Sequence, residues 1–462
     1  MRRLPGQLSG RSTVIVLLVL LASGCGDAGD TPGGQQPGTS SQGGSSPGGQ
    51  PAAELPPLAP APVQVPAGLG AAPFNTARTL NIPRGWTVSV YARIDKARFM
   101  AVTPSGELLV SQPSTGAVQI VRSAAGGAGG QVSQFIGGLN RPHDMVFAEV
   151  NGQTWLFIAE AGRVVRYPYA KGDVRAQPGQ VAVDGLPDSS TPELRGQYAH
   201  VLKNIAVHAG VLYVSIASTC NACVEDTRSD PQRAAIYTYD AAGHNASRKL
   251  FATGLRNAEG LAFVPGTAQL WVVVNNRDNT LVPDDRDVDG DGRSDKGKRV
   301  TKFVDDYPLE PFTSVKEGGF YGWPFCNPNS DNGPRNMPFH RDYELNRDGQ
   351  RADCAKATPI DVGLQAHTAP LGLTFTQGTK APNIGAVIPM HGSWNRSTPS
   401  GYKVIYFPWT ANGPGEQREL ATGWLVGGRS WGRPVDVAVD PDGALLVSDD
   451  AAGAVYKLTP AK

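Results

Sequence analysis

The chain has 462 residues, and its 42 Lys and Arg are nearly balanced by 41 Asp and Glu, giving a formal net charge of +1. This lack of a basic excess argues against a nucleic-acid-binding protein. The 56 Gly and 38 Pro interrupt the chain too often for long helices and favour short strands joined by turns. We therefore expect an all-β protein without a nucleic-acid partner.

Residues 1–24 have the features of a signal peptide. Basic residues precede an apolar run over 14–22, which is too short to span a bilayer. The segment that ends in Cys25 resembles the lipobox of bacterial lipoproteins, in which that cysteine carries the lipid, although Ala22 stands where the pattern prefers Leu. The resemblance implies a lipid-anchored protein of the bacterial cell envelope, at the outer membrane and facing the periplasm. An ordinary signal peptide is the alternative.

Residues 25–77 are predicted to form a disordered tether. Gly, Pro and Ser make up 16 of the 25 residues over 26–50, and such a composition buries too little apolar surface to offset the entropy of ordering. Pro-rich spacing continues to about Pro73. The folded domain is therefore predicted to span 78–462.

One strand–turn–strand unit recurs six times in this domain. Each unit has an alternating apolar strand, a turn and a second apolar strand, and in most units another strand follows. Units spaced mostly by about 40 to 65 residues predict a six-bladed β-propeller with four-stranded blades, and a β-sandwich is the alternative. The units lie at residues 100–110, 144–160, 204–215, 260–274, 371–389 and 436–448.

Five short motifs also follow one another along the domain. They are Gly254-Leu-Arg-Asn-Ala-Glu-Gly, Gly318-Gly-Phe-Tyr-Gly-Trp-Pro, Ala369-Pro-Leu-Gly-Leu-Thr-Phe, His391-Gly-Ser-Trp-Asn-Arg and Gly432-Arg-Pro-Val-Asp-Val. Together they resemble the glucose/sorbosone dehydrogenase family, whose members are six-bladed propellers that oxidise sugars with pyrroloquinoline quinone (PQQ) and calcium. The fourth motif makes the sorbosone and pyranose dehydrogenase branch the more similar one.

The resemblance implies two catalytic residues. His200 matches the general base that takes the proton of the substrate hydroxyl, which a neutral imidazole can do near neutral pH. Arg256 matches the arginine that stabilises charge on the quinone oxygen. A structural histidine and a surface salt bridge are the respective alternatives. Other candidates for the base are His367, His391 and, more weakly, His143.

The resemblance also implies cofactor contacts. Arg396 and Arg433 match cationic positions that hold the carboxylates of the cofactor, where guanidinium geometry allows paired hydrogen bonds. Lys203 is a basic neighbour at a position where the branch often has Arg. Trp394 could stack on the flat quinone or lie in the core, and His391 is expected at the pocket rim.

Two calcium sites are predicted. Acidic residues occupy positions 1, 3, 5 and 9 of a calcium-loop pattern, with Gly292 at position 6. Lys298 replaces the usual Glu at position 12, so either Asp305 or Asp306 completes the site or the site is weak, and a solvated acidic loop is the alternative. The resemblance places the catalytic ion elsewhere, on backbone carbonyls of Asn275 and Asn276. The acids of the loop are Asp287, Asp289, Asp291 and Asp295.

Four cysteines remain besides Cys25, an even number in an exported chain, which favours disulfides. The short spacing suggests a local Cys220–Cys223 bridge, which leaves Cys326 to pair with Cys354. A zinc site made of the four thiolates is the alternative.

The leading functional hypothesis is a PQQ- and calcium-dependent dehydrogenase. It would transfer hydride from an aldose, a sorbosone-like aldehyde or a related pyranose to the quinone, and pass electrons to a separate acceptor. One alternative is a propeller without cofactor that acts as a binding module. Another is a calcium-dependent lactonase-type hydrolase, which would need carboxylates and amides converging on the central channel. The acids of the sequence concentrate instead in the loop 287–295.

Overall fold

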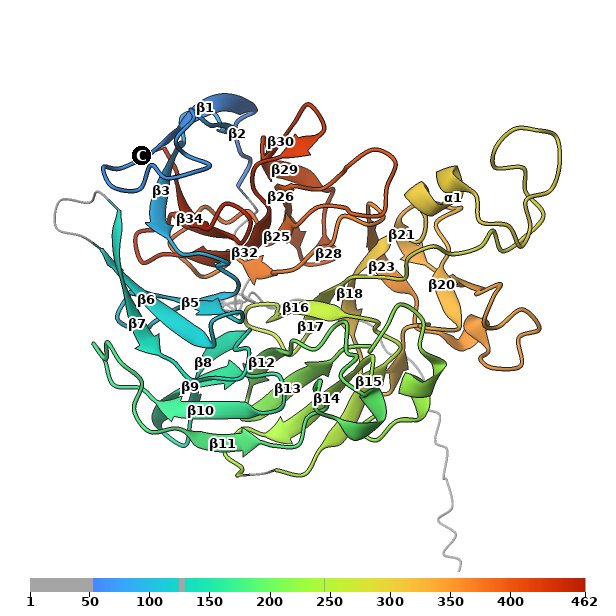
Figure 1. Cartoon of the computed structure of the whole chain (residues 1–462), viewed down its shortest axis with the longest axis horizontal. Coiled ribbons are helices and arrows are strands. Elements are labelled where there is room, and N and C mark those ends of the chain that lie inside the picture. Colours follow the sequence, from blue (N-terminus) through green and yellow to red (C-terminus); the bar gives the residue numbers. More distant parts are fainter. Residues whose placement is uncertain (1–52, 124–128, 245, 462) are drawn as a thin grey trace, which may run out of the picture. The chain divides into compact units, whose positions relative to one another are not determined.

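The computed structural model describes residues 53–123, 129–244 and 246–461, which form a ring of six β-sheets. Figure 1 shows the sheets following one another round the ring in chain order. Each unit predicted from the sequence supplies the first two strands of one sheet. The six-bladed propeller is therefore confirmed.

The first three blades are built from successive antiparallel strands. The first contains β4 (Met100–Val102), β5 (Leu108–Gln112), β6 (Ala117–Ser123) and β7 (Gly130–Ile136). The second contains β8 (Met145–Val150), β9 (Gln153–Ala159), β10 (Val164–Pro168) and β11 (Gln180–Val183). The third contains β12 (Asn204–His208), β13 (Val211–Ile216), β14 (Ala235–Asp240) and β15 (Lys249–Thr253), edged by β19 (Gly319–Phe320).

The fourth and fifth blades carry the largest insertions. The fourth contains β16 (Ala258–Phe263), β17 (Leu270–Val274), β18 (Glu310–Val315), β23 (Ile360–Leu364) and β21 (Arg335–Met337). Its insertions hold α1 (Thr301–Asp306) and the hairpin of β20 (Cys326–Pro328) and β22 (Phe339–Arg341). The fifth contains β24 (Thr374–Phe375), β25 (Ala386–Met390), β26 (Lys403–Phe407) and β29 (Arg418–Ala421), with the hairpin of β27 (Trp409–Thr410) and β28 (Gly413–Pro414).

The sixth blade joins the two ends of the domain. It contains β32 (Pro434–Val439), β33 (Leu445–Asp449) and β34 (Ala454–Thr459), followed by β3 (Thr87–Arg93), β1 (Leu58–Gln64) and β2 (Thr79–Pro83). Its first strand is preceded by the hairpin of β30 (Leu425–Val426) and β31 (Arg429–Ser430). β3 pairs antiparallel with β34, with Val90 opposite Tyr456. The ring is thus closed by a strand from the opposite end of the chain, which removes two sheet edges. Short 3₁₀ helices lie at Pro192–Leu194, Val224–Arg228 and Cys354–Lys356.

Buried carboxylates connect the inner strands of neighbouring blades. Asp144 accepts a hydrogen bond from the backbone N–H of Ile205 at 2.9 Å, and Asp436 accepts one from that of Met100 at 2.8 Å. Burial raises the pKa of Asp144 to about 8 and that of Asp436 to about 7. Each carboxyl thereby satisfies a backbone donor that an inner strand leaves unpaired.

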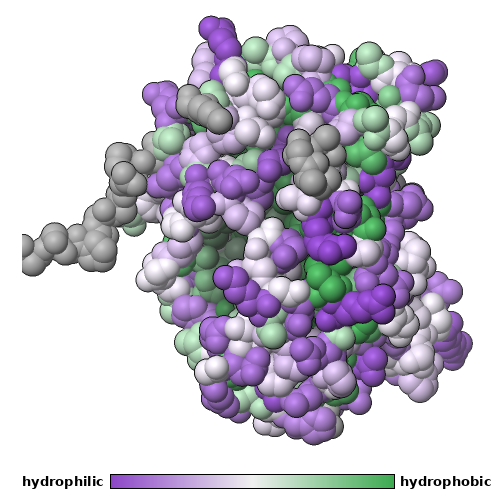
Figure 2. Space-filling view, turned by 90° about the vertical axis from the view of Figure 1, so that its left-hand side faces the viewer, coloured by the Kyte–Doolittle hydropathy of each residue, from purple (hydrophilic) through white to green (hydrophobic). Residues whose placement is uncertain are grey.

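The outer strands meet solvent. Most residues of β7 are exposed, and Figure 2 shows mostly hydrophilic and neutral residues on that side of the propeller, with small apolar patches between them. Among the described residues, no helix has the length and apolar character needed to cross a bilayer.

The predicted domain boundary at Arg78 is too late. Residues 58–64 form β1, and Phe74 is only 6% exposed, with its ring 5.9 Å from that of Tyr456 and 6.1 Å from that of Trp431. Composition alone cannot reveal this contact, because both aromatic partners come from the other end of the chain. Residues 1–52, including the predicted signal peptide, Cys25 and the first part of the tether, lie outside the described residues.

We predict that a chain beginning at Arg78 unfolds at lower urea concentration than one beginning at Ala53. It loses the buried Phe74 and three backbone carbonyls, of Leu69, Ala71 and Ala72, that accept hydrogen bonds from Arg93. The expected loss is about 3 kcal/mol or more. Equal unfolding midpoints for the two chains would show that β1 adds nothing to the ring.

Candidate active site

A cavity of about 570 Å³ opens at the face of the ring where the inner strands begin. Most of its walls come from segments that precede inner strands or follow second strands, whereas Glu259 lies in β16 and Glu310 begins β18, so residues far apart in sequence meet there. Loops on a rigid β scaffold commonly carry binding and catalytic groups. A second cavity, of about 260 Å³, is lined by the inner strands of all six blades. The charged and imidazole side chains of the first cavity are Arg98, His200, Arg256, Glu259, Asp278, Glu310, His367, His391 and Arg433.

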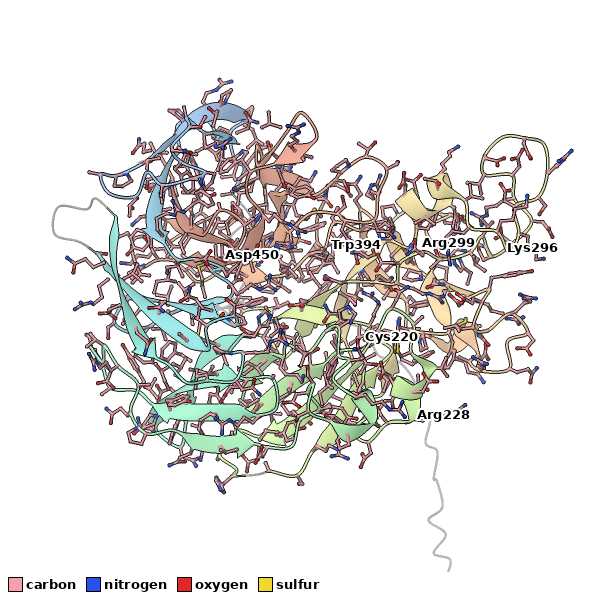
Figure 3. All side chains as sticks on the ribbon, viewed as in Figure 1. Cys220, Arg228, Lys296, Arg299, Trp394 and Asp450 are labelled. Atoms are coloured by element: carbon pink, nitrogen blue, oxygen red, sulfur yellow. A yellow bond between two sulfur atoms is a disulfide. The ribbon has the colours of Figure 1, made fainter. Side chains whose placement is uncertain are left out.

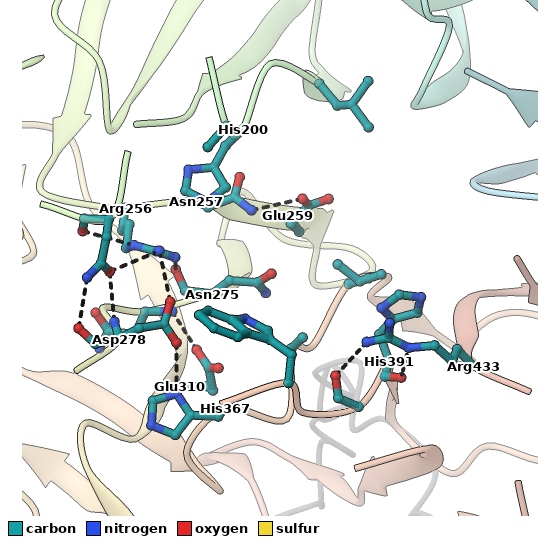
Figure 4. Close-up of a pocket in the computed structure, with 18 of the residues that line it drawn as sticks. His200, Arg256, Asn257, Glu259, Asn275, Asp278, Glu310, His367, His391 and Arg433 are labelled. Carbon is teal, nitrogen blue, oxygen red and sulfur yellow. Dashed lines mark hydrogen bonds and ion pairs between the residues drawn. The ribbon is translucent and has the colours of Figure 1, made fainter. Parts of the chain in front are cut away.

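Most of the predicted site residues lie at this cavity. Figure 4 shows His200 and Arg256 on one side and His391 and Arg433 on the other. Lys203 and Arg396 are not among the residues that line it. The predicted residues that line it are His200, Arg256, Asn275, Asn276, His367, His391, Trp394 and Arg433.

His200 has one ring nitrogen committed and one available. Its Nδ1 lies 2.8 Å from the backbone oxygen of Ser218, and since a carbonyl only accepts, Nδ1 must carry the proton. Nε2 therefore holds a lone pair, and it has no hydrogen-bond partner among the described residues. Burial, followed by the positive charge of Arg256, lowers the pKa of His200 to about 4. The ring is thus neutral near pH 7 and can accept a proton at Nε2.

Asp278 lies between two cationic groups. One of its oxygens is 3.2 Å from Nη2 of Arg256, and the other is 3.1 Å from Nδ1 of His367. Nε2 of His367 donates to the backbone oxygen of Val304 at 2.6 Å. Burial lowers the pKa of His367, but the hydrogen bond to Asp278 and the nearby Glu310 outweigh it and raise the pKa. His367 is therefore an ion-pair partner with both nitrogens occupied, which removes it as a candidate base.

His391 is held by a carboxylate on the opposite side of the cavity. Its Nε2 lies 2.9 Å from Asp450, which also accepts from Arg98 at 3.0 Å. Burial lowers the pKa of His391 more than Asp450 raises it. His391 is thus neutral and remains an alternative base. The Nε–H of Arg98 is buried and has no hydrogen-bond acceptor among the described residues.

Sequence reasoning missed the acids of the cavity. Glu259, Asp278 and Glu310 line it, so the expectation that the acids concentrate in the loop 287–295 is wrong. Burial raises the pKa of Glu310 to about 7, whereas for Glu259 burial is outweighed by hydrogen bonds from His143 and Asn257 together with the charges of His143 and Arg98, which lower its pKa. Glu259 belongs to the motif that begins at Gly254, and this was the only sequence signal that could have placed an acid at the cavity. His143 is fully buried and bonded to Glu259, as a structural histidine would be.

Lys203 supports the loop that carries His200. Its Nζ is fully buried, donates to the backbone oxygen of Val201 at 2.5 Å and lies 4.8 Å from the ring of Tyr198. Burial lowers its pKa to about 7. The expected cofactor contact is therefore wrong, because the side chain points into the protein under the loop.

Arg396 is also directed away from the cavity. Its guanidinium donates to the backbone oxygen of Asp305, and Nη2 lies 3.8 Å from Asp306. Both acids belong to α1, so Arg396 fastens the loop after β25 to this helix. The prediction that Arg396 holds the cofactor is wrong for this arrangement. Asp305 and Asp306 face this loop and are not in the group of acids that approach one another in the loop 287–295.

Three of the four loop acids approach one another. Asp287, Asp289 and Asp295 have carboxylate oxygens within 4.8 Å of each other, and Asp291 is not part of this group. Lys298 lies 3.0 Å from Asp295 and supplies a positive charge where the pattern expects a ligand. Calcium at this loop stays a prediction.

The wall that carries Asn275 and Asn276 offers oxygen atoms for a cation. Glu310 accepts from the backbone N–H of Asn276 at 2.5 Å, and Asp278 lies in the same wall. The carbonyl of Asn275 already accepts from Arg256 at 3.2 Å, which makes it a poorer cation ligand than the carboxylates.

Both predicted disulfides are present. Cys220 is bonded to Cys223, and Cys326 to Cys354. The first closes a tight loop around Asn221, which accepts hydrogen bonds from Arg256 through its backbone and side-chain oxygens at 3.2 and 3.1 Å. The local bridge thus shapes the loop that orients Arg256.

The family model described as TrAA12-like matches residues 80–461. The chain belongs to this family. Among curated proteins, an uncharacterized protein of Borreliella burgdorferi is 27% identical over 219 residues, which cover 46% of this chain and 48% of that protein. A PQQ-dependent pyranose dehydrogenase of Coprinopsis cinerea is 31% identical over 137 residues, covering 25% of this chain and 18% of that protein. The chain thus spans at most about half of these curated relatives.

Solved structures share the fold over most of the chain. The holo form of the pyranose dehydrogenase PQQ domain from Coprinopsis cinerea has a TM-score of 0.66 at 20% identity, covering 82% of this chain and 97% of that one. The calcium structure of a family AA12 enzyme from Trichoderma reesei has a TM-score of 0.63 at 20% identity, covering 82% and 96%. These neighbours share the fold of this chain.

We predict that Arg256→Met raises the pKa of His200 from about 4 towards 6.5. Burial is the larger cause of the low value and persists, so the rise is partial, whereas the coulombic contribution of Arg256 disappears. The imidazole resonances can be titrated by NMR in the protein without cofactor. An unchanged titration would mean that the guanidinium does not act on this ring.

Proposed function

We propose that this protein is a PQQ- and calcium-dependent dehydrogenase that oxidises a sugar and passes the electrons to a separate acceptor. The observation that carries the proposal is the neutral His200, whose free Nε2 stands at the cavity beside Arg256. Family membership and neighbours that are PQQ- or calcium-containing structures support it.

The donor set of the cavity fits an anionic cofactor. Arg98, Arg256 and Arg433 line it, and the buried Nε of Arg98 lacks an acceptor. Arg433 uses Nε and Nη2 for the backbone oxygens of His391 and Gly392, which fixes the guanidinium and leaves Nη1 without a partner among the described residues. Arg98 and Arg433 would hold carboxylates of the cofactor, and Arg256 would face the quinone. When bound, PQQ supplies a hydride acceptor.

The chain itself supplies the base and its orientation. Ser218 holds Nδ1–H of His200, so the ring can turn only Nε2 to the substrate hydroxyl and take its proton there. Burial and then the charge of Arg256 keep the resting imidazole unprotonated, and the ion pair with Asp278 fixes the guanidinium. General-base catalysis of this kind typically contributes about 10²- to 10⁴-fold.

A catalytic calcium ion would use the wall around Asn276. We assign its ligands to the carbonyl of Asn276 and the carboxylate of Glu310, with Asn275 as a weaker candidate because its carbonyl is shared with Arg256. A bound dication would also ionise Glu310, whose pKa is about 7 in its absence.

A calcium-dependent hydrolase is the second candidate. Carboxylates and amides do converge on the cavity, where Glu259, Asp278 and Glu310 stand beside Asn257 and Asn276. This is the arrangement such a hydrolase would need. The family match favours the dehydrogenase.

Reconstitution separates the hypotheses. The apoprotein is incubated with PQQ and Ca²⁺ and assayed for dye reduction with a panel of sugars, and in parallel for lactone hydrolysis without PQQ. Sugar-dependent dye reduction that is lost on calcium chelation is expected. Lactone turnover without PQQ would favour the hydrolase. The absence of both turnover and a cofactor-dependent absorbance would favour a binding module.

We predict that His200→Asn lowers kcat by about 10²- to 10⁴-fold while PQQ still binds. The amide keeps a donor for Ser218 but cannot take the proton. His244→Asn, at an exposed histidine, is the matched control and should leave kcat unchanged. If His391→Asn rather than His200→Asn abolishes turnover, the base is His391.

We predict that the acid limb of kcat/KM lies near pH 4 instead of near 6.5. The base works only when unprotonated, and burial with Arg256 holds the pKa of His200 at about 4. Activity should therefore persist as the pH falls from 7 to 5 and drop as it passes through about 4. A limb at 6.5 would contradict this assignment.

We also propose that Cys25 carries a lipid that anchors the protein at the bacterial outer membrane, facing the periplasm. The support is the resemblance of the segment before Cys25 to a lipobox. Mass spectrometry of the mature N-terminus would test it, and an unmodified Cys25 would contradict the anchor.

A further inference from the structure

Trp394 is unusually exposed for an aromatic residue. It is 73% exposed, while the other large exposed apolar side chains of the described part are all Val or Leu. The remaining seven tryptophans are buried or half-buried. An indole left in water at the mouth of a cavity commonly marks a binding surface, because its large apolar face gains most from being covered. Trp394 also lines the cavity of the candidate site.

Trp394 lies in an ordered loop. Ser393 and Ser400 are joined by two hydrogen bonds, and Tyr402 donates to the backbone oxygen of Ser393 at 2.7 Å. Arg396 fastens the other side of the loop to α1. These contacts fix the backbone on both sides of Trp394, and its indole is 73% exposed.

An amide accompanies the indole at the rim. Asn279 also lines the cavity, and its Oδ1 accepts from Asn395 at 3.3 Å, which ties the neighbour of Trp394 to it. The side-chain NH₂ of Asn279 has no partner among the described residues. Arg299 donates to the backbone oxygen of Asn279 at 3.3 Å and fixes this turn. Figure 3 labels Trp394 and Arg299 on this part of the molecule.

An apolar ring face beside a free amide suits a sugar. A pyranose has a face of C–H groups that can stack on an indole and an edge of hydroxyls that can accept from an amide. The reacting unit must lie at His200, among the arginines and carboxylates of the cavity, whereas Trp394 stands at the solvent side. A ring stacked on Trp394 is therefore a second ring, beyond the one that reacts.

We propose that Trp394 and Asn279 form an outer saccharide subsite, so that the preferred substrate is an oligosaccharide or glycoside of at least two rings. This inference rests on the proposed function, because it takes the inner end of the cavity as the oxidation site. A substrate of this class would contact both the polar interior of the cavity and the indole at its rim.

Kinetics of the reconstituted enzyme test the subsite. The probes are glucose, cellobiose, cellotriose, maltose and maltotriose, with Trp394→Ala, Trp394→Phe and the control Val426→Ala, which removes an exposed apolar side chain outside the cavity. We expect Trp394→Ala to raise KM for at least one series of longer sugars about tenfold more than it raises KM for glucose, and Trp394→Phe to lie between. Equal changes for glucose and the longer sugars, or none, would overturn the proposal.

A second measurement needs no cofactor. Trp394 is the only strongly exposed tryptophan, so acrylamide should quench its fluorescence selectively. A di- or trisaccharide of the panel should protect it in wild type, glucose should not, and Trp394→Phe should remove the protectable signal. Protection without sugar oxidation would support the subsite while overturning the proposed function. Oxidation without protection by any probe would overturn the subsite and keep the function.

Discussion

The pairing of β3 with β34 is the constraint on which the site depends. The cavity is lined by segments from different blades, and their distances are set only when the ring is closed. A sheet that stayed open would leave an unpaired edge at each end and would not bring Arg98 of the first blade near Asp450 of the sixth. Closure therefore fixes the electrostatics of the cavity as well as the stability of the fold.

The three imidazoles of the cavity show how local contacts set chemistry. His200 donates through Nδ1 to a carbonyl, His391 through Nε2 to a carboxylate, and His367 through both nitrogens. His200 and His391 are thus neutral imidazoles with different nitrogens protonated, whereas His367 is a cation. Identity alone could not distinguish them, because the partners are a backbone oxygen and acids distant in sequence.

The propeller could be predicted because its signal repeats. The sequence of each blade contains the same strand–turn–strand pattern, which can be recognised from residues that are close together in the chain. The positions of Arg256 and Arg433 at one cavity followed from two of the family motifs, and that of His200 followed from the family resemblance. The directions of Lys203 and Arg396 could not be predicted, since a cation near a motif can point to either side of its loop. Glu310 carried no motif at all, and only its place beside Asn276 reveals it.

The fastening of Arg396 to Asp305 links two segments that lie outside the blades. The loop after β25 presents the indole, and α1 holds that loop in place. If only α1 were exchanged, the guanidinium of Arg396 could lose its acceptor. If only the loop after β25 were exchanged, α1 would lose the hydrogen bond from Arg396. The loop at the rim can therefore be re-engineered only together with α1, and the six blades and the rest of the cavity can be left unchanged.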